Sequence, residues 1–528
     1  MKGPQVGPGE ILPLVRRLPG APDPLALFSA LTEGGRTDTI MLESADAASG
    51  QGERSILLPR TMLRLEGRGS VVRIEPLTPN GVTLRDWLGC ALAKQASISR
   101  DGDSLVAEWP PIATDQESRA RLRSAGPLDA LRAIVHRIRL VSEPATFAHL
   151  AAGIFAYDLV DSQESLPPAK SDLLDFPDFV FWVPEQLVVL DHVHRSTTIL
   201  AHVVGGEGSE ASYHDAVRAV ERLSRAVVTV GAGPCPALDT PGARHGPAPT
   251  MDLDDTAYAS LVDHLKRHIV AGDVFQIVPS RTFSLPCTDP FTAYSRLRAA
   301  NPSPYMFLVR APGFTLLGAS PETAVRVAGR PRSVILRPIA GTAPRGRNPD
   351  GSEDHELDAR FQAALMTDAK ELAEHMMLVD LARNDVARVS RPGTRRVSKL
   401  LTVDRYQHVM HLVSEVIGEL DAGLDSLHAY AASLNMGTLV GAPKIRAAEL
   451  LRENECSKRG PYGGAVGYLT HSGDMDTAII IRSALVRGGT AYVRAGAGVV
   501  LDSDPARESD ETRRKAMAVL QAVGGAPA

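Results

Sequence analysis

A stretch dense in proline and glycine, residues 231–250 (GAGPCPALDTPGARHGPAPT), divides this 528-residue chain. Proline removes a backbone donor and glycine favours turns, so this composition is typical of a linker. A chain of this length exceeds one ordinary hydrophobic core, so we expect two domains or one large compound fold. The predicted boundaries are an N-terminal domain at residues 1–230, a linker at 231–250 and a C-terminal domain at 251–520.

Strand-like patterns occur in both segments, and helix-like patterns are found in the C-terminal one. Runs rich in valine, isoleucine and aromatic residues between turn signals predict strands, and apolar residues three and four apart predict amphipathic helices. Strands joined as hairpins with helices between them favour an α+β fold over a parallel doubly wound sheet. The expected strands are residues 179–183, 186–192, 197–204, 274–278, 478–486 and 491–500, and the expected helices are 252–271, 361–386 and one that begins at Asp504-Pro505.

Charge, apolar runs and cysteine spacing exclude several classes of protein. The net charge of -5 without a strongly basic block argues against nucleic-acid binding. No apolar run reaches the roughly 18 residues of a membrane span, and the N-terminus lacks the apolar core of a signal peptide. The widely spaced cysteines argue for a reducing cytoplasm and against a disulfide framework or a zinc site. They are Cys90, Cys235, Cys287 and Cys456.

Two pairs of glutamates have a spacing that suits metal ligands on helices. Glu371 and Glu374 lie three residues apart in KELAEHMMLVDLARND. Glu508 and Glu511 have the same separation in DPARESDETRRKA. Residues three apart share one face of a helix, so each helix can aim two carboxylates at one point. Four converging carboxylates repel unless a hard cation lies between them, and Mg²⁺ fits because it takes few protein oxygens and keeps several waters. The alternative is two solvated helix faces.

Longer motifs follow one another through the C-terminal half. They are GDVFQIVPSR (272–281), NPSPYMF (301–307), GASPE (318–322), RPIAGTAPRGR (337–347), KELAEHMMLVDLARND (370–385), VDRYQHVMHLVSEVIGEL (403–420), NMGTLVGAPK (435–444), YGGAVGY (462–468) and AGAGVVLDSDPARESDETRRKA (495–516). In this order they resemble the chorismate-utilising enzymes, and most closely the large subunit of anthranilate synthases. The resemblance is dense from about residue 255 to 520 and patchier earlier, at MLESAD (41–46) and GIFAYDLVD (153–161).

The resemblance implies a fold, a reaction and a cofactor. The fold has layered antiparallel β-sheets flanked by helices, with an N-terminal regulatory part packed on a chorismate-binding part. The reaction converts chorismate and ammonia to anthranilate and pyruvate, the first step of tryptophan biosynthesis, with Mg²⁺ on the ring carboxylate to stabilise charge as the double bonds shift. By the same resemblance, Glu374 and Glu511 are the direct metal ligands. Glu371 and Glu508 bind the metal directly or through water.

Catalytic positions follow from the same motifs. Hydroxide is a poor leaving group, so an acid must protonate the ring hydroxyl of chorismate. Glu322 in GASPE holds the general-acid position, which requires burial or nearby anions to raise its pKa; the alternative is a surface glutamate after a turn. His411 matches a histidine that faces the substrate ring and is associated with pyruvate elimination, although a histidine among apolar residues is usually packed in a core. The resemblance adds Thr438 and Gln276 to this set.

Substrate binding is expected from an arginine and a glycine-containing segment. Arg482 lies in the apolar run IIIRSALV, where a buried charge must find a partner, and a planar guanidinium suits the enolpyruvyl carboxylate of chorismate. The alternative is an edge-strand arginine. Glycines admit close approach of backbone amides to a carboxylate, although G-A-G alone is more often a bulge or turn. The further substrate contacts implied by the resemblance are Gly341, Thr342, Tyr462, Gly496, Ala497 and Gly498.

Two positions distinguish the relatives from each other. Members that add water carry a lysine base where this chain has Gln276, and a glutamine cannot deprotonate water, whereas ammonia is already nucleophilic. Bacterial aminodeoxychorismate synthases typically read PIKGT where this chain has Ala340 in PIAGT. Both positions favour amination to anthranilate. The alternatives are an aminodeoxychorismate synthase, a 2-amino-2-deoxyisochorismate synthase that stops before pyruvate loss, and a non-catalytic tryptophan-binding regulatory subunit.

A partner and an inhibitor are also implied by the resemblance. None of the cysteines lies in the G-x-C-x-G elbow of an amidotransferase, so ammonia is expected from glutamine through a separate amidotransferase subunit, in a heterotetramer by family type. Leu42, Glu43 and Ser44 resemble the family's L-L-E-S site for the feedback inhibitor L-tryptophan. Residues Pro304, Tyr305 and Met306 of NPSPYMF would complete that site. The alternative is that NPSPY is only a turn and Ser44 a surface residue.

Overall fold

The computed structural model of the chain describes residues 5–44, 53–111, 118–141, 147–232, 247–406 and 409–524. Most of the predicted linker lies outside these residues, as does Cys235. None of the helices described is long and apolar enough to cross a bilayer. The cysteines that the structure describes are free thiols, namely Cys90, Cys287 and Cys456.

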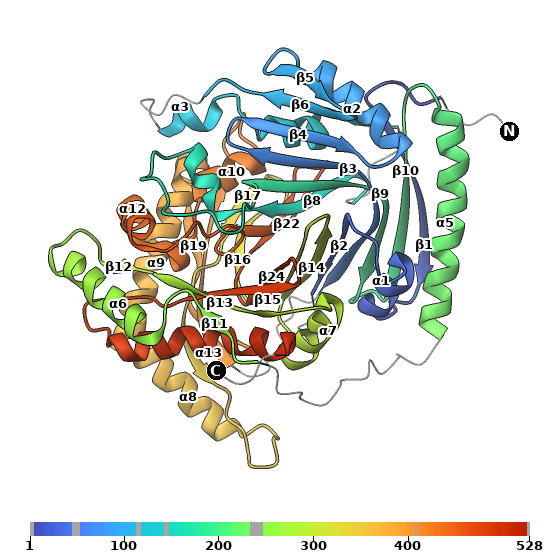
Figure 1. Cartoon of the computed structure of the whole chain (residues 1–528). Helices are drawn as coiled ribbons and strands as arrows, with labels where there is room; N and C mark the ends of the chain where they lie inside the picture. The colour runs from blue at the N-terminus through green and yellow to red at the C-terminus, as the bar shows by residue number, and fades with distance from the viewer. Residues whose placement is uncertain are drawn as a thin grey trace.

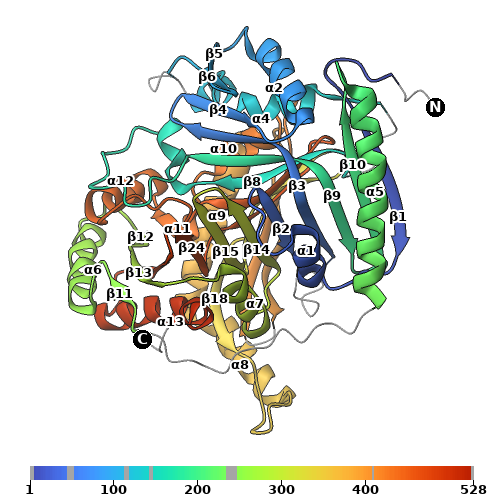
Figure 2. The ribbon, with the colours of Figure 1, turned by 45° about the vertical axis from the view of Figure 1, so that its right-hand side comes forward.

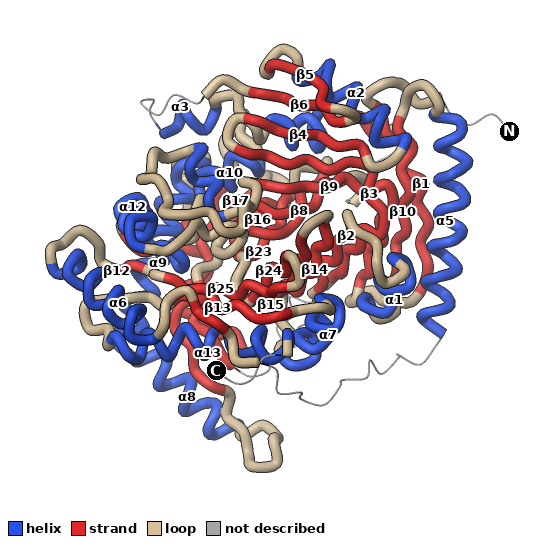
Figure 3. The backbone as a smooth tube through the Cα atoms, viewed as in Figure 1, coloured by secondary structure: helices blue, strands red, loops and turns tan. Residues whose placement is uncertain are grey.

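Two long strands, β3 (Arg54–Arg68) and β9 (Phe179–Asp191), pair with each other and belong to both layers of the fold. Their pairing is irregular between Leu57 and Leu63, where β9 contains Pro184. Proline is tolerated in strands at such irregularities, because the lost backbone donor would interrupt a regular ladder. At this bend the sheet turns from one layer into the other, as Figure 3 shows.

The first layer runs from the N-terminal strands through β9 and β3 to strands of the C-terminal segment. Its pairings among the described residues are antiparallel, apart from the short parallel contact of β7 with β1. In spatial order it contains β7 (Arg139–Leu140), β1 (Glu10–Pro19), β10 (Ser196–Val204), β9, β3, β2 (Thr39–Glu43), β14 (Tyr305–Ala311), β15 (Phe314–Ser320), β24 (Ser483–Arg487), β25 (Thr490–Gly496), β13 (Ser280–Pro286) and β11 (Thr250–Met251).

The second layer shares β3 and β9 and is antiparallel throughout the described residues. In spatial order it contains β5 (Ser97–Asp101), β6 (Ser104–Glu108), β4 (Val71–Pro76), β3, β9, β8 (Leu150–Phe155), β22 (Ala465–Thr470), β23 (Met475–Ile479), β16 (Thr323–Ala328), β17 (Ser333–Leu336) and β20 (Val409–Glu419), with β18 (Ile339–Pro344) and β19 (Arg396–Arg405) also on β20. A separate two-stranded ribbon joins β12 (Gln276–Ile277) to β21 (Gly441–Ala442).

Strands from both sides of the predicted linker build both layers. In the first layer β2 pairs with β14, and in the second layer β8 pairs with β22. The two segments therefore share one hydrogen-bonded framework, in which N-terminal strands lie directly against strands that carry the C-terminal motifs (Figure 1).

Helices cover the outer faces of the two layers (Figure 2). On the first layer these are α1 (Pro24–Thr32), α5 (Ser209–Ala232), α7 (Pro290–Ala300) and α13 (Pro505–Val523). On the second they are α2 (Pro79–Leu92), α4 (Asp129–Arg132), η1 (Ala133–Arg137), α9 (Ala369–Val389) and α10 (Ser426–Ser433). Around the ribbon lie η2 (Tyr157–Ser162), α6 (Asp255–Val270), α11 (Gly437–Val440) and α12 (Lys444–Asn454), while α8 (His355–Thr367) projects beside β18 and α3 (Ser118–Arg123) lies near α10.

Three large apolar clusters match this layering. One lies between the sheets and includes Trp182 and Phe307, both at most 1% exposed. The other two lie between each sheet and its helices. Full burial of one apolar side chain such as that of Phe307 contributes about 1.5–3 kcal/mol to stability. The three clusters therefore hold the two sheets to each other and to their helices. The predicted α+β fold of layered antiparallel sheets with flanking helices is confirmed.

Two predicted elements are interrupted in the structure. The helix expected at residues 361–386 is two helices, because Asp368 ends α8 and caps α9 by accepting hydrogen bonds from the amides of Lys370 and Glu371. The strand expected at residues 478–486 breaks at Arg482, whose φ is +48°. There the chain leaves the second layer at β23 and enters the first layer at β24.

Candidate active site

Several of the predicted site residues come from elements that meet between the ribbon, α9, α13 and the second layer. Glu322 immediately precedes β16, Thr342 lies in β18 and His411 lies opposite it in β20. Thr438 lies in α11 and Arg482 in the crossing between β23 and β24. These positions are far apart in sequence, and antiparallel pairing together with the crossing brings them together.

The imidazole of His411 is buried, and only one of its two nitrogens has a hydrogen-bond partner among the described residues. Its Nδ1 lies 2.9 Å from the hydroxyl of Thr342, and its Nε2 is buried without a hydrogen-bond partner. Burial and the nearby Arg482 lower the pKa of His411 to about 4, so the ring is neutral at physiological pH. A neutral imidazole with one nitrogen fixed and the other unsatisfied is oriented to interact with a ligand.

The carboxyl group of Glu322 is also buried, with 7% of the residue exposed. Burial raises its pKa to about 8, although Thr438, Arg482 and Lys515 each lower it. The hydroxyl oxygen of Thr438 is buried and makes no hydrogen bond of ordinary geometry. Glu322 is therefore mostly protonated at neutral pH and able to donate a proton.

Arg482 presents a cation without an acidic partner. Among the described residues no carboxylate lies within ion-pair distance of its guanidinium, and burial lowers its pKa while Glu322 raises it. Its left-handed backbone, with φ of +48°, stores strain of about 1–3 kcal/mol that the surrounding strands must sustain. A strained, half-buried arginine with no ion-pair partner among the described residues is an arrangement that a bound anion could stabilise.

Glycine at positions 496 and 498 allows close contacts with polar side chains. A Cβ at Gly496 would lie 3.2 Å from the Tyr462 hydroxyl. A Cβ at Gly498 would lie 2.9 Å from the side-chain nitrogen of Gln276. The side-chain oxygen of Gln276 is buried without a hydrogen-bond partner. Burial raises the pKa of Tyr462 to about 12, so the phenol remains a neutral donor.

The four predicted metal-binding carboxylates lie close enough to affect each other. Burial, together with the nearby Glu371, Glu508 and Glu511, raises the pKa of Glu374 to about 7, although Lys370 lowers it. Burial and Glu511 also raise the pKa of Glu371 and of Glu508. The carboxylates of α9 and α13 are thus near enough to interact electrostatically.

Lysines accompany two of these carboxylates. Lys370 lies 3.8 Å from Glu374, and Lys515 lies 2.7 Å from Glu511 and donates to the carbonyl of Gly496 at 3.1 Å. In the part of the chain that the structure describes, no three acidic, histidine or cysteine side chains are arranged at metal-coordinating distances. Lys515 was missed by sequence reasoning, although its i+4 spacing from Glu511 was a usable signal.

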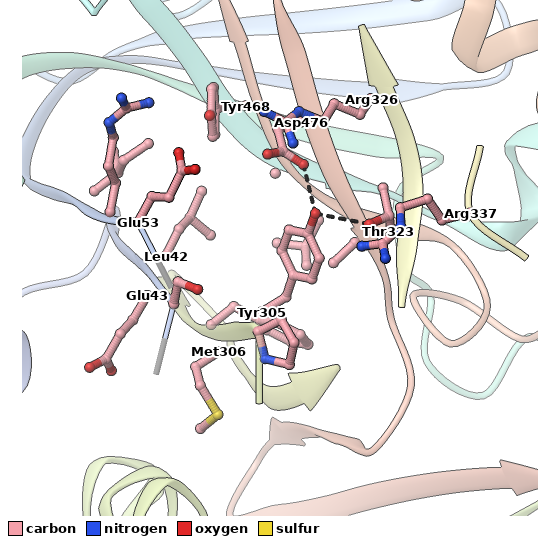
Figure 4. Close-up of a pocket in the computed structure, with 18 of the residues that line it drawn as sticks. Leu42, Glu43, Glu53, Tyr305, Met306, Thr323, Arg326, Arg337, Tyr468 and Asp476 are labelled. Atoms are coloured by element: carbon pink, nitrogen blue, oxygen red, sulfur yellow. Dashed lines mark hydrogen bonds between the residues drawn. The ribbon is translucent and has the colours of Figure 1, made fainter. Parts of the chain in front are cut away.

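A second site lies between the two layers, where a pocket of about 410 Å³ opens. All six residues predicted for the inhibitor line it, namely Leu42, Glu43, Ser44, Pro304, Tyr305 and Met306. The hydroxyl of Tyr305 donates to Asp476 at 3.0 Å and lies 3.0 Å from the Thr323 hydroxyl (Figure 4). A volume of this size, lined by aliphatic, aromatic and many charged side chains, suits a small molecule that carries both apolar and charged groups.

Two of the six side chains turn away from the pocket. Glu43 alternates with Leu42 along β2, and its carboxylate accepts hydrogen bonds from Tyr294 at 3.0 Å and Arg298 at 2.6 Å on α7. Met306 is buried in the cluster on the outer face of the first layer. Figure 4 shows both side chains directed away from the Tyr305 hydroxyl. These residues border the pocket through their backbone, because neighbouring residues of a strand face opposite sides.

Comparisons with known proteins give a consistent result. A family model described as chorismate binding enzyme matches residues 97–521. The chain is 47% identical to anthranilate synthase component 1 of Vibrio cholerae, over 96% of this chain and 95% of that protein. It is also 47% identical to the pyocyanine-specific anthranilate synthase component 1 of Pseudomonas aeruginosa, over 92% and 90%. The crystal structure of anthranilate synthase component I from Streptococcus pneumoniae superposes with a TM-score of 0.67 at 30% identity, covering 88% of this chain and 92% of that one.

Proposed function

The chain belongs to the chorismate-binding enzymes and, within them, to the anthranilate synthase component 1 group, and from this premise we propose that it is the aminating subunit of an anthranilate synthase. The proposed reaction converts chorismate and ammonia to anthranilate, pyruvate and water. The observation that carries the proposal is the buried, protonated Glu322 beside the unpaired Arg482 and the oriented His411.

Binding of chorismate is proposed to use its two carboxylates. The guanidinium of Arg482 can hold the enolpyruvyl carboxylate through two parallel hydrogen bonds, which would satisfy the buried charge. The backbone of residues 496–498 and the hydroxyl of Tyr462 lie beside the same space and supply further donors. The ring would then lie toward His411, whose Nε2 lacks a protein partner.

Proton transfer is proposed to come from Glu322. Ammonia attacks C2 of the ring, the double bonds shift, and the C4 hydroxyl leaves as water once Glu322 has protonated it. The pKa of about 8 keeps this carboxyl group protonated before the reaction. Elimination of pyruvate then removes the proton from C2, and the neutral His411 is placed at the ring to assist it. Gln276 is a neutral amide and does not act as a base for water.

Mg²⁺ is proposed as the cofactor, held by Glu374 and Glu511, with Glu371 and Glu508 bound directly or through water. The donor set fits a hard cation, because burial and nearby carboxylates raise the pKa values of Glu371, Glu374 and Glu508, and Lys370 offsets this only in part. Such an ion takes few protein oxygens and keeps several waters, so it would not need all four carboxylates at bonding distance. When bound, the ion would supply Lewis-acid stabilisation of charge on the ring carboxylate.

A separate glutamine amidotransferase subunit is proposed as the source of ammonia. The partner is implied by the component 1 relatives and by the absence of an amidotransferase cysteine motif in the sequence. The test is to assay the isolated chain with chorismate and Mg²⁺, once with an ammonium salt at high pH and once with glutamine. We expect turnover with ammonium and none with glutamine. Turnover of glutamine by the chain alone would contradict a separate amidotransferase.

L-Tryptophan is proposed to bind the 410 Å³ pocket as a feedback inhibitor. Leu42 and Tyr305 supply apolar surface for an indole, and Ser44 lies at the end of β2 where an amino or carboxylate group can be bound. Titration calorimetry with L-tryptophan should give heat of binding for the native chain and little for Ser44→Arg. Equal heats for the two proteins would exclude Ser44 from the site.

A further inference from the structure

The pocket proposed for the inhibitor and the cavity beside the catalytic acid are separated by a single layer of residues. A small cavity of about 30 Å³ is lined by Glu322 and Thr438 on the active-site side. Thr323 and Arg337 line both this cavity and the 410 Å³ pocket. The wall between the two sites is therefore one strand thick at β16 and at the chain that follows β17.

Glu322 and Thr323 are consecutive residues whose side chains lie on opposite sides of this wall. Neighbouring side chains of extended backbone point in opposite directions, so Thr323 faces the pocket while Glu322 faces the active site. The backbone of both is fixed on β23: Thr323 is paired with Ala478, and the amide of Ile479 donates to the carbonyl of Glu322 at 3.0 Å. A displacement of the Thr323 backbone would therefore be passed directly to the adjoining backbone of Glu322.

Tyr305 lines the pocket, and its hydroxyl is hydrogen-bonded to Thr323 in the wall. Its single proton is donated to Asp476 at 3.0 Å, so the hydroxyl of Thr323 is the donor in the 3.0 Å hydrogen bond between Thr323 and Tyr305. Tyr305 follows Pro304, and both residues line the pocket. A ligand that moves the Tyr305 ring would change the only hydrogen bond of the Thr323 side chain found among the described residues.

The start of β16 is paired irregularly, so it can shift when Thr323 is displaced. The pairing of β16 with β23 changes register between Thr323 and Arg326, directly after the acid. Irregularities of this kind weaken the local ladder and re-aim side chains, and they are common beside active sites. A small shift of Thr323 can thus be taken up locally without breaking the rest of the sheet.

We propose that Thr323 is a positioning residue that transmits occupancy of the pocket to Glu322 through its hydrogen bond with Tyr305. The inference rests on the proposed function, because it requires that L-tryptophan binds the pocket and that Glu322 is the acid. A bound ligand displaces the Tyr305 ring, the start of β16 follows, and the carboxyl group of Glu322 leaves the position from which it protonates the leaving hydroxyl.

The test uses Thr323→Val, which keeps the shape of the side chain and removes the hydroxyl, with Thr323→Ser as the conservative control. Binding of L-tryptophan is measured by calorimetry, and activity at saturating L-tryptophan is divided by each protein's own uninhibited rate. We expect Thr323→Val to bind L-tryptophan within about threefold of the native affinity while losing inhibition by about tenfold, the size of a typical coupling between sites. Thr323→Ser should restore inhibition.

The other possible outcomes distinguish a failure of this inference from a failure of the proposed inhibition by L-tryptophan. Thr323→Val that binds L-tryptophan and remains fully inhibited would overturn the inference and leave the proposed regulation intact. Loss of L-tryptophan binding in Thr323→Val would overturn it by making Thr323 a ligand contact. A native chain that makes anthranilate but binds no L-tryptophan would overturn the proposed regulation. If Thr323→Val does not fold, Thr323→Ala removes the same hydroxyl, and the ratio of inhibition to binding is read in the same way.

Discussion

The hydroxyl of Thr342 lies 2.9 Å from Nδ1 of His411, while Nε2 of the same ring is buried without a partner. One nitrogen is thus committed to the protein and the other is directed to whatever occupies the site. Because the ring is buried and lies near Arg482, it is neutral, and its role is to accept or pass a proton rather than to supply positive charge.

Removal of this ring should impair chemistry more than folding. His411→Ala is expected to lower kcat by roughly 10²–10⁴-fold, the usual contribution of a positioned acid-base group. The matched control is His355→Ala on the exposed start of α8, which should keep the native rate. Steady-state kinetics with ammonium as the nitrogen source measures both. A native rate for His411→Ala would show that the ring is only a packing residue.

The raised pKa of Glu322 predicts a pH dependence for activity. The protonated carboxyl group is the active form, so kcat/KM should fall as pH rises through about 8. In Glu322→Gln the rate should be lower by about 10²-fold or more, and this limb should vanish. Exposed Glu356→Gln on α8 is the control and should keep the native profile. A profile that is unchanged in Glu322→Gln would remove this residue from the acid role.

The same carboxyl group also makes stability depend on pH. Its folded pKa of about 8 lies above the ordinary glutamate value of 4.5, so between these two pH values the folded state keeps a proton that the unfolded state has released. Stability should therefore fall as pH rises from about 4.5 to about 8, and Glu322→Gln should reduce that slope in urea titrations at several pH values.

The convergence of α9 and α13 predicts that metal binding needs both helices. Glu374→Gln and Glu511→Gln should each lose measurable Mg²⁺ binding by calorimetry and lose most activity, because each removes a charged oxygen ligand. Asp510→Asn is a control on the same helix, where Asp510 forms an exposed pair with Arg514 at 3.2 Å. Native Mg²⁺ affinity in both glutamine variants would place the cation elsewhere.

A buried ion-pair network supports the substrate side of the site. Glu455 accepts hydrogen bonds from Arg459 at 2.6 Å and from Arg494 at 2.9 Å, and Arg459 lies over the ring of Tyr462. Glu455→Ala leaves two buried guanidinium groups without their acid, so the free energy of unfolding should fall by about 3–5 kcal/mol.

The control for this network is an exposed ion pair on the same helix. Glu449→Ala breaks the pair with Arg446 on α12 and should cost about 1 kcal/mol or less. Urea unfolding followed by circular dichroism compares the two variants. Similar losses for Glu455→Ala and Glu449→Ala would contradict the structural role of Glu455.

The sequence allowed the local parts of this structure to be predicted. Asp504 and Pro505 mark the start of α13 because an N-cap residue followed by proline is a local signal. The apolar pattern also predicted β9 and β10, although it divided β9 at Pro184, where the strand is irregular but continuous. The motifs placed Glu322 and His411 by resemblance, and the structure supplied their burial.

Features that depend on distant contacts were not predictable in the same way. The apolar run around Arg482 resembles one strand, but the two halves belong to different layers, and only tertiary packing reveals the crossing. Thr323 carries no sequence signal at all, because its importance comes from Tyr305 and from the two cavities that it separates. Alternation along β2, by contrast, was a local sign that Glu43 faces away from Leu42.

Product identification tests the central claim most directly. The purified chain is incubated with chorismate, Mg²⁺ and an ammonium salt, and the products are resolved by fluorescence and mass spectrometry, with Glu322→Gln as the inactive control. The account predicts anthranilate and pyruvate in equal amounts. Accumulation of aminodeoxychorismate, of 2-amino-2-deoxyisochorismate or of isochorismate, or no product from a folded chain that binds L-tryptophan, would contradict it.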